Sequence, residues 1–584
     1  MLTVLILTIA CTVTHAEIVQ NANMESLSVA PWHCHGCTAS ISHDSLNGKQ
    51  SIMISHRRAG WAGIEQTVQV QPNHYYFFNV HLKLVNMVPG HMYHHVSVKF
   101  KYTVNSHVHY VRISYSPMQQ VSFGYQEIGG DFHVPNGVNS ITIYIEINEA
   151  AANYLLDDAT LQEITPNTNW KLEAQARIEK IRKAPLNIKI ENHDNADTSA
   201  FKIEIKQVTS SFAFGTAVRA DIMMDQNQKA YHDFVYNNFE WATIANSLKW
   251  RLMEFTQGHP IWNKGIPALN LLRSKRMKVR GHNMFWGVQH NCPKWILNMT
   301  SSDLNNAMHA RIHGMMQHTT GKVEHWDVNN ENLHGDFYEQ HMSSPNITMK
   351  MFEWMRLQDK SMKLFLNEFN VVMDSSSTTA YRNQGDIFKT SGVPIYGLGV
   401  QSHFHSVPSS IDVVKYRLDK LAEADLPLWI TELTIREADE NKKAAVLEDI
   451  MTLYFSHSSI QGIVFWGFQN SSIHDHAAAL TSNDIVPNAA GRKYQELFHK
   501  TWRTNEVHPV ASTINAKGFL GDYELTLVHQ NTVIHTENFT LDNNGANPTF
   551  HIRGTDGRFL NCSHSINVCL FASSGVHVAQ VAFG

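Results

Sequence analysis

The sequence predicts a multidomain protein in which a (β/α)8 TIM barrel lies between an N-terminal all-β sandwich and a small C-terminal β module. The chain has 584 residues, which is too long for one hydrophobic core. Its two ends carry short runs of alternating apolar and polar residues, which are typical of β-strands. The middle of the chain alternates between strand-like and helix-like patterns, as a barrel of this type requires.

Residues 17–165 are predicted to form the first sandwich. Turn residues separate the apolar runs, and no amphipathic helix of any length interrupts them, which favours an all-β fold. The runs lie at residues 51–54, 63–70, 75–84, 94–104, 108–115 and 141–147.

The barrel is predicted at residues 211–505. Eight strand-like runs start about 30 to 45 residues apart, and helical patterns such as residues 444–456 separate them. The runs lie at residues 212–216, 241–246, 278–285, 323–328, 363–367, 395–402, 428–431 and 462–466. Polar residues gather where these runs end, which is where such barrels place their active sites: Asn246, His282, Glu331, Glu368, His403 and Glu432.

Two regions flank the barrel. Residues 166–210 are predicted to be a connector, with a basic helix at 170–183 and then strands at 186–190 and 201–207. Residues 506–584 are predicted to be a separate small β domain of unknown role, with strands at 523–529, 532–539 and 550–553.

Composition and charge exclude several classes of partner. The formal net charge is -5 and the pI is near 6.7, so we expect no nucleic acid partner. The 36 histidines form no tract and no HExxH motif, so the sequence predicts no metal site and no cofactor. The chain contains 13 Trp, 18 Tyr and 28 Phe, whose flat rings suit both sugar faces and ordinary core packing.

Residues 1–16 are an apolar run that ends in Thr14-His15-Ala16, a small-x-small cleavage pattern. Its length fits a signal peptide better than a membrane span, and no later segment is long and apolar enough for a span. We therefore expect a secreted, extracellular monomer that does not bind a membrane.

The six cysteines fit an oxidising compartment. Cys11 lies in the signal peptide, and Cys292 has no near neighbour in the sequence. Cys34 and Cys37 form one close pair, and Cys562 and Cys569 form another, so each pair can form a local disulfide. Cys34 to Cys37 also fits a metal or redox motif, but no second pair is nearby, which favours a disulfide or free thiols.

Two glutamates at strand ends carry the catalytic hypothesis. Glu331 follows a strand-like run at 323–328, and Glu432 follows the run at 428–431. A single such glutamate is better explained as a side chain that simply faces water. Two that face each other across a barrel provide the acid and the nucleophile of retaining glycoside hydrolysis.

Residues 17–165 resemble the family 4/9 type of carbohydrate-binding module, which has a jelly-roll fold. The resemblance rests on VQNANME at 19–25, WAGIEQ at 61–66 and YLLDD at 154–158. It implies a sugar-binding surface to which an exposed ring such as Trp61 contributes, although a buried tryptophan is equally typical of a sandwich.

Residues 174–502 resemble glycoside hydrolase family 10, the endo-1,4-β-xylanase family. Eight strings occur in the family's order, and they are FGTA at 214–217, NSLKW at 246–250, RGHNMFW at 280–286, WDVNNE at 326–331, LNEFN at 366–370, GLGVQSH at 397–403, TEL at 431–433 and VFWG at 464–467.

This resemblance implies roles for individual residues. Glu331 would be the acid/base, Glu432 the nucleophile, and Asn330 would bind the sugar 2-hydroxyl at the cleaved bond. His403 would orient and polarise Glu432. The substrate-binding residues would be Asn246, Lys249, His282, Trp286, Gln289 and Gln401, with Trp466 as a stacking floor.

The chain departs from the family pattern at several positions. Ala245 stands where the family usually has a glutamate before the asparagine, so sugar binding there should be weaker or differently selective. A charge-assisted bond of this kind contributes ~1.5–3 kcal/mol. Thr434 stands where an aspartate usually contacts the equivalent of His403. Gly287 replaces a common histidine, and residues 471–475 lack an expected tryptophan.

The sequence thus predicts a secreted retaining endo-β-1,4-glycanase that hydrolyses xylan. The departures from the family pattern also allow action on β-1,4-glucan. The alternative from a different class is a non-catalytic secreted protein that binds polysaccharide on a degenerate barrel. Ala245, Thr434 and the missing tryptophan favour this alternative, whereas the intact Glu331 and Glu432 favour an enzyme.

Overall fold

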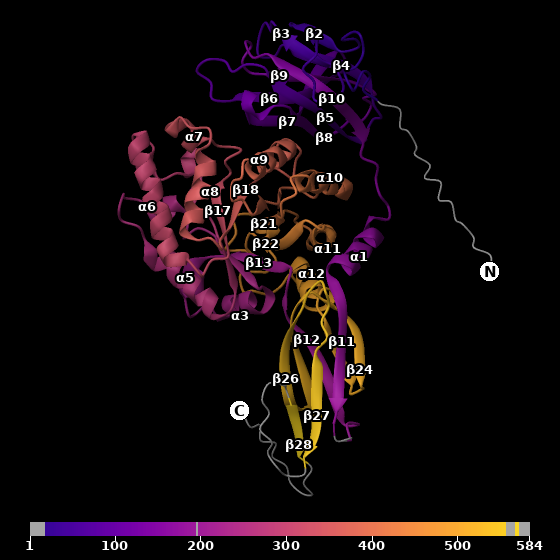
Figure 1. Cartoon of the computed structure of the whole chain (residues 1–584), viewed down its shortest axis with the longest axis vertical. Coiled ribbons are helices and arrows are strands. Elements are labelled where there is room, and N and C mark those ends of the chain that lie inside the picture. Colours follow the sequence, from indigo (N-terminus) through magenta and orange to yellow (C-terminus); the bar gives the residue numbers. More distant parts are fainter. Residues whose placement is uncertain (1–17, 194–196, 556–566, 572–584) are drawn as a thin grey trace, which may run out of the picture. The chain divides into compact units, whose positions relative to one another are not determined.

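The structure is a computed structural model that describes residues 18–193, 197–555 and 567–571. It divides into two compact units, of which the first contains the N-terminal sandwich and the second contains most of the barrel and a second sandwich (Figure 1). The predicted signal peptide at 1–16 and Cys562 lie outside the described residues.

The N-terminal sandwich consists of two five-stranded antiparallel sheets, in the orders β1-β4-β9-β6-β7 and β2-β3-β10-β5-β8. Alternation along the strands turns one face of each sheet inward, where Ile54, Phe78, Phe100 and Ile145 are fully buried. The predicted all-β sandwich is confirmed. The strands are β1 His33–His35, β2 Thr38–Ser42, β3 Ser51–Ser55, β4 Gly63–Gln69, β5 Tyr75–Leu84, β6 His94–Val104, β7 His107–Gln119, β8 Gln126–His133, β9 Ser140–Ile147 and β10 Tyr154–Glu163.

Eight parallel strands close the predicted barrel, because β13 pairs with both β14 and β22, and β15 pairs with β17. Trp241, Phe365 and Trp429 fill the barrel interior with flat rings around His325. The strands are β13 Ala213–Val218, β14 Trp241–Ile244, β15 Lys278–Gly281, β17 His325–Asn330, β18 Lys363–Glu368, β19 Gly397–Val400, β21 Leu428–Ile435 and β22 Ile460–Phe465. Two short strands, β16 Phe285–Trp286 and β20 His403–Phe404, extend the sheet beside β17 and β21.

Helices connect the barrel strands and surround them in Figure 1. The predicted helix at 444–456 is part of the longer α11, which begins after Asp439 because the Asp439 carboxylate accepts hydrogen bonds from the amides of Asn441 and Lys442. The helices of this region are α2 Ala220–Met224, α3 Lys229–Asn238, α4 Trp250–Met253, α5 Trp262–Ser274, α6 Ser301–Thr319, α7 Phe337–Met342, α8 Ile347–Gln358, α9 Thr378–Thr390, α10 Ile411–Ala422, α11 Glu440–Ser456 and α12 Ala489–Glu496.

The second sandwich is built from both ends of the barrel sequence, which the sequence analysis did not anticipate. The predicted connector helix is α1 (Trp170–Ile181), and β11 (Lys183–Asn192) and β12 (Phe201–Ser210) follow it. β11 pairs with β24 and β27, and β12 pairs with β23 and β25. The remaining strands are β23 Asn505–Pro509, β24 Thr513–Phe519, β25 Gly521–His529, β26 Thr532–Leu541, β27 Thr549–Thr555 and β28 Asn567–Phe571.

Two predicted domains are therefore one. The prediction that the strands before the barrel and residues 506–584 form separate regions is wrong, because their apolar faces form one core. Ile188 and Ile203 from the first segment are buried with Leu525 and Phe550 from the second. Neither segment alone has enough strands to cover its apolar face.

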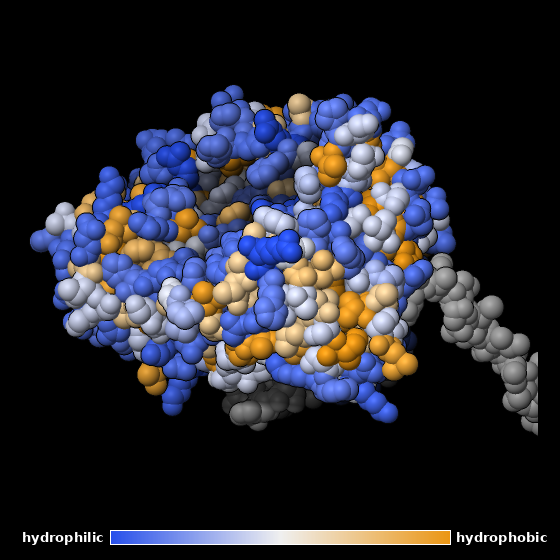
Figure 2. Space-filling view, turned by 90° about the horizontal axis from the view of Figure 1, so that it is seen from above, coloured by the Kyte–Doolittle hydropathy of each residue, from blue (hydrophilic) through white to orange (hydrophobic). Residues whose placement is uncertain are grey.

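The structure also shows the state of the cysteines and the character of the surface. Cys34 and Cys37 form a disulfide, and Cys292 is a buried free thiol. Among the described residues, no helix is both long enough and apolar enough to cross a membrane. On the face drawn in Figure 2, hydrophilic residues cover most of the surface and apolar residues form small groups between them.

Candidate active site

A cavity of about 510 Å³ opens at the C-terminal ends of the barrel strands. This end is where a parallel barrel gathers its loops and strand-end side chains. Eight of the residues predicted from the sequence line the cavity: Lys249, His282, Trp286, Glu331, Gln401, His403, Glu432 and Trp466.

Glu331 is the first residue after β17. Its φ angle is 57°, in the left-handed region that a non-glycine residue adopts at a cost of roughly 1 kcal/mol or more. Trp286 donates from Nε1 to Glu331 Oε2 at 2.7 Å, and Gln401 donates from Nε2 to Glu331 Oε1 at 3.1 Å. Both oxygens are therefore held by neutral donors.

The environment of Glu331 favours its protonated form. Burial raises its pKa first, the charges of Glu368 and Glu432 add to this effect, and the bonds from Trp286 and Gln401 oppose it only in part. The pKa of Glu331 is raised to about 7. A carboxyl group with this pKa can donate a proton near neutral pH.

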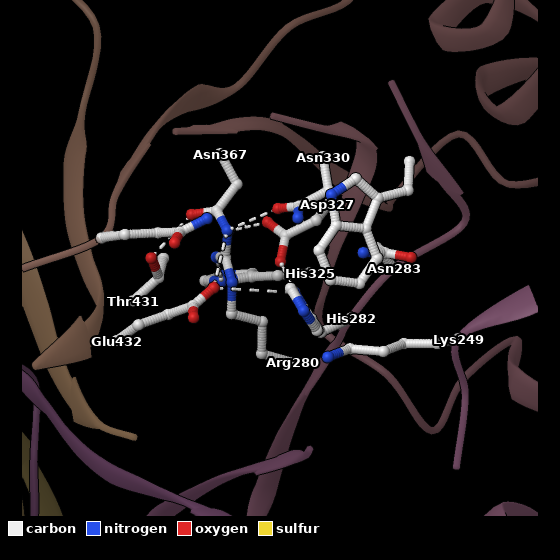
Figure 3. A network of polar contacts seen from close by, with 12 residues as sticks. Lys249, Arg280, His282, Asn283, His325, Asp327, Asn330, Asn367, Thr431 and Glu432 are labelled. Atoms are coloured by element: carbon white, nitrogen blue, oxygen red, sulfur yellow. Dashed lines mark hydrogen bonds and ion pairs between the residues drawn. The ribbon is translucent and has the colours of Figure 1, made fainter. Parts of the chain in front are cut away.

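Glu432 lies within β21 and is 4% exposed. His403 Nε2 contacts its Oε2 at 3.1 Å, and Asn367 donates from Nδ2 to its Oε1 at 3.0 Å. Asn367 also donates to Asn330 Oδ1 at 2.8 Å and accepts a bond from Thr431, so it joins β17, β18 and β21 at the site (Figure 3).

The pKa of Glu432 is shifted in the opposite direction. Burial alone would raise it, but the bond from His403 and the charges of His282, His403 and Lys249 together outweigh burial. The pKa of Glu432 is lowered to about 2, so this carboxylate stays ionised at neutral pH. A buried ionised carboxylate beside a protonated carboxyl is the arrangement of a nucleophile and an acid.

A buried network of polar side chains adjoins Glu432 (Figure 3). Asp327 on β17 forms an ion pair with Arg280 and contacts His282 Nδ1 at 2.9 Å. His282 in turn lies 3.9 Å from Glu432 Oε1. Burial and the charge of Arg280 hold the pKa of His325 well below its usual range, so His325 is neutral beside Arg280. The network fixes the ring of His282 toward Glu432.

His403 connects Glu432 to the position where the sequence departs from the family pattern. Strand pairing places His403 of β20 opposite Thr434 of β21. His403 Nδ1 contacts Thr434 Oγ1 at 2.9 Å, while Nε2 contacts Glu432. On its Nδ1 side the imidazole is therefore held by a hydroxyl group, where the family pattern has a carboxylate.

Lys249 provides positive charge beside two flat rings. Its Nζ lies 4.8 Å from the Trp286 ring centre and 5.5 Å from that of Trp466. Asn246, which follows β14 and is exposed, accepts a bond from Lys249 Nζ at 3.1 Å. Burial lowers the pKa of Lys249, and the charges of Glu432 and Glu331 partly offset this effect. The two rings and the ammonium group form a surface on which a sugar can stack.

Asn330 is fully buried at the end of β17 and does not line the cavity itself. Its Oδ1 is bonded by Asn367, but its Nδ2 is buried without a hydrogen-bond partner. A buried donor of this kind is costly unless a ligand satisfies it. The unpaired amide fits the predicted contact with a substrate hydroxyl.

Asn246, although it is bonded by Lys249, does not line the cavity, and neither does the predicted binding residue Gln289. The short turn η2 (Gln289–Asn291) leaves its side chain exposed, and the next two residues, His290 and Asn291, line the cavity. The sequence analysis also missed the lining residues Val288, His334, Phe369, Asn370 and His405. Phe369 and Asn370 directly follow β18, so extending the strand-end rule by two residues would have found them.

Two regions of the chain match known protein families. Residues 204–489 match Glycosyl hydrolase family 10, and residues 16–152 match a Carbohydrate binding domain. Endo-1,4-beta-xylanase 1 of Arabidopsis thaliana is 29% identical over 424 residues, covering 72% of this chain and 44% of that protein. Anti-sigma-I factor RsgI6 of Acetivibrio thermocellus is 32% identical over 372 residues, covering 62% of this chain and 48% of that protein. The chain thus spans about half the length of these relatives.

Among solved structures, xylanase 10B from Thermotoga petrophila RKU-1 in complex with xylobiose matches with a TM-score of 0.46 and 21% identity, covering 50% of this chain and 95% of that chain. The predicted resemblances are confirmed in their predicted order along the chain. Residues 204–489 belong to glycosyl hydrolase family 10, and a carbohydrate binding domain precedes them at residues 16–152.

Proposed function

We propose that this protein is a retaining endo-1,4-β-xylanase. The observation that carries the proposal is the pair of carboxyl groups in one cavity whose pKa values are shifted apart, to about 7 at Glu331 and about 2 at Glu432. Family membership and the name of the Arabidopsis relative support xylan as the substrate.

The reaction would proceed in two displacements. Glu432 attacks the anomeric carbon while Glu331 transfers its proton to the departing glycosidic oxygen. The bond to the sugar removes the negative charge of Glu432, and that charge is one of the causes that raise the Glu331 pKa. Glu331, now ionised, then takes a proton from the water molecule that releases the sugar.

Other groups in the cavity would bind and orient the substrate. The unpaired Nδ2 of Asn330 would donate to the sugar 2-hydroxyl. Trp466 and Trp286 would contact sugar faces beside Lys249. Because Ala245 supplies no carboxylate to bind a sugar hydroxyl, the enzyme would select less strictly for xylan and would also act on β-1,4-glucan. The disulfide between Cys34 and Cys37 supports an extracellular location.

Hydrolysis assays on the purified protein test the proposal. We expect reducing ends from xylan, and fewer from carboxymethylcellulose. Glu331→Gln and Glu432→Gln should each lower activity by at least 100-fold, because the first removes the acid/base group and the second removes the nucleophile. Glu339→Gln is a matched control. Burial also raises the pKa of Glu339 to about 7, but its carboxylate accepts a bond from Thr348 and does not line the cavity.

The outcomes separate the enzyme from the binding protein. If the wild type releases no sugar from either polymer, the proposal is wrong, whether or not the protein still binds xylan. Proton NMR of the first product tests the stereochemistry. The β anomer must form first, and initial formation of the α anomer would show an inverting enzyme.

A further inference from the structure

A cluster of three potential metal ligands lies on the second sandwich, away from the catalytic residues in the sequence. It consists of Glu191, His193 and His551, whose ligand atoms all lie within 4.8 Å of one another. We propose that these residues bind a divalent transition-metal ion of the Zn²⁺ type. The site is independent of the proposed xylanase reaction.

Sheet geometry places the three side chains together. β11 and β27 run parallel, and Glu191 is directly opposite His551 in their register. His193 lies two residues beyond Glu191 and is held to β27 by a 2.9 Å bond from its amide to the Ile552 carbonyl. Residues two apart on a strand share a face, so all three point to the same side of the sheet.

That side faces solvent, because the opposite side forms the core. Ile190 and Ile552, the neighbours of the cluster along the strands, are 5% and 0% exposed. The side chains of Glu191, His193 and His551 are 31%, 37% and 22% exposed. An ion can therefore reach the site, which stands on two paired strands.

The distances fit a tetrahedral ion. His193 Nε2 and His551 Nδ1 lie 2.9 Å apart, and Glu191 Oε2 lies 3.5 Å and 3.3 Å from them. Bonds of about 2.0–2.2 Å to Zn²⁺ at tetrahedral angles place neighbouring ligand atoms about 3.4 Å apart. The two nitrogens need to separate by only a few tenths of an ångström to bind the ion.

The ring nitrogens of His193 and His551 are close enough to share a proton or a metal ion. Two unprotonated nitrogens at 2.9 Å would turn their lone pairs toward each other, so a proton or a metal ion must lie between them. Lys189 occupies the other oxygen of Glu191, Oε1, at 2.5 Å, which leaves Oε2 for the histidines. Such outer contacts orient metal ligands.

The donor atoms select the class of metal. Two imidazole nitrogens and one carboxylate oxygen suit Zn²⁺ and similar transition ions, whereas Ca²⁺ and Mg²⁺ prefer sites made only of oxygen. A water molecule would complete the coordination. The ion would join β11, which precedes the barrel in sequence, to β27, which follows it, and would thereby clamp the two halves of the second sandwich.

Calorimetric titration of the chelator-treated, full-length protein with ZnCl₂ tests the site. Wild type should bind one equivalent of Zn²⁺ that Glu191→Gln, His193→Ala and His551→Ala lose or bind at least tenfold more weakly. His508→Ala is the matched control, because His508 is a histidine of the same sandwich that pairs with one carboxylate, Glu506. The His508→Ala variant should still bind one equivalent of Zn²⁺ with the affinity of the wild type.

Two further measurements exclude indirect effects. Circular dichroism of the metal-free variants should match that of the wild type, since all three side chains are on the solvent face. Co²⁺ should give a visible absorption band of tetrahedral type in the wild type and in His508→Ala but not in the three variants. Equal Zn²⁺ stoichiometry and affinity in wild type and all three variants would overturn the proposal.

Discussion

Glu331 and Glu432 are the same kind of residue, and their neighbours give them opposite protonation states. Glu331 is bonded by two neutral donors, Trp286 and Gln401. Glu432 instead receives bonds from His403 and Asn367. The difference of about five pKa units arises because burial and the charges of Glu368 and Glu432 raise the pKa of Glu331. The bond from His403 and the positive charges around Glu432 lower the pKa of Glu432.

The two pKa values predict the pH dependence of kcat/KM. Activity requires ionised Glu432, so it is gained as pH rises through about 2, and it requires protonated Glu331, so it is lost as pH rises through about 7. Gln401→Leu removes a donor that favours the ionised form of Glu331. The upper limb should therefore move to higher pH by about half a unit to one unit. A limb that stays in place, measured on xylan, would contradict this assignment.

Thr434 predicts a second change in the pH profile. Thr434→Asp places a carboxylate at the position where the hydroxyl contacts His403 Nδ1 at 2.9 Å. This carboxylate would stabilise the protonated imidazole that bonds to Glu432, so the shape of the kcat/KM profile should change. Thr434→Val, which removes the hydroxyl at similar volume, separates lost hydrogen bonding from added charge. Identical profiles for wild type and Thr434→Asp would show that His403 is not coupled to this position.

At the scale of elements, the sequence predicted the barrel strands well because each strand is a local pattern. All eight runs correspond to observed strands, although the predicted 241–246 ends two residues earlier, as β14 at Ile244. Strand ends also identified Glu331, Glu432 and His403. Loop residues were harder to predict. In η2 the direction of each side chain depends on the shape of the turn and not on strand alternation, so the sequence could not show that Gln289 lies outside the cavity lining.

Pairing between distant segments was the part that the sequence could not show. Glu191 and His551 lie opposite each other in the sheet, but 359 intervening residues separate them in the chain. No short motif records such a pair, so the absence of an HExxH pattern said nothing about this cluster. The same reason explains why the strands before the barrel were assigned to a region separate from their partners.

At the scale of the whole molecule, the second sandwich and the catalytic cavity use separate sets of residues. The sandwich core contains Ile188, Ile203, Leu525 and Phe550, none of which lines the cavity. The sandwich joins the segment before the barrel to the segment after it. The folded state of both segments therefore depends on the stability of this one core. Stability and catalysis should therefore respond to different substitutions.

Adjacent residues of β12 test this separation. Ile203 is fully buried in the sandwich core, and Lys202 beside it is exposed. Ile203→Ala should lower the free energy of unfolding of the sandwich by about 2–5 kcal/mol, because it leaves a cavity in a packed core. Lys202→Ala should change it by less than about 0.5 kcal/mol. Scanning calorimetry measures the transition, and xylan hydrolysis well below that transition measures kcat, which should be unchanged in both variants. A loss of kcat in Ile203→Ala while the barrel remains folded would show that the sandwich core contributes to the geometry of the active site.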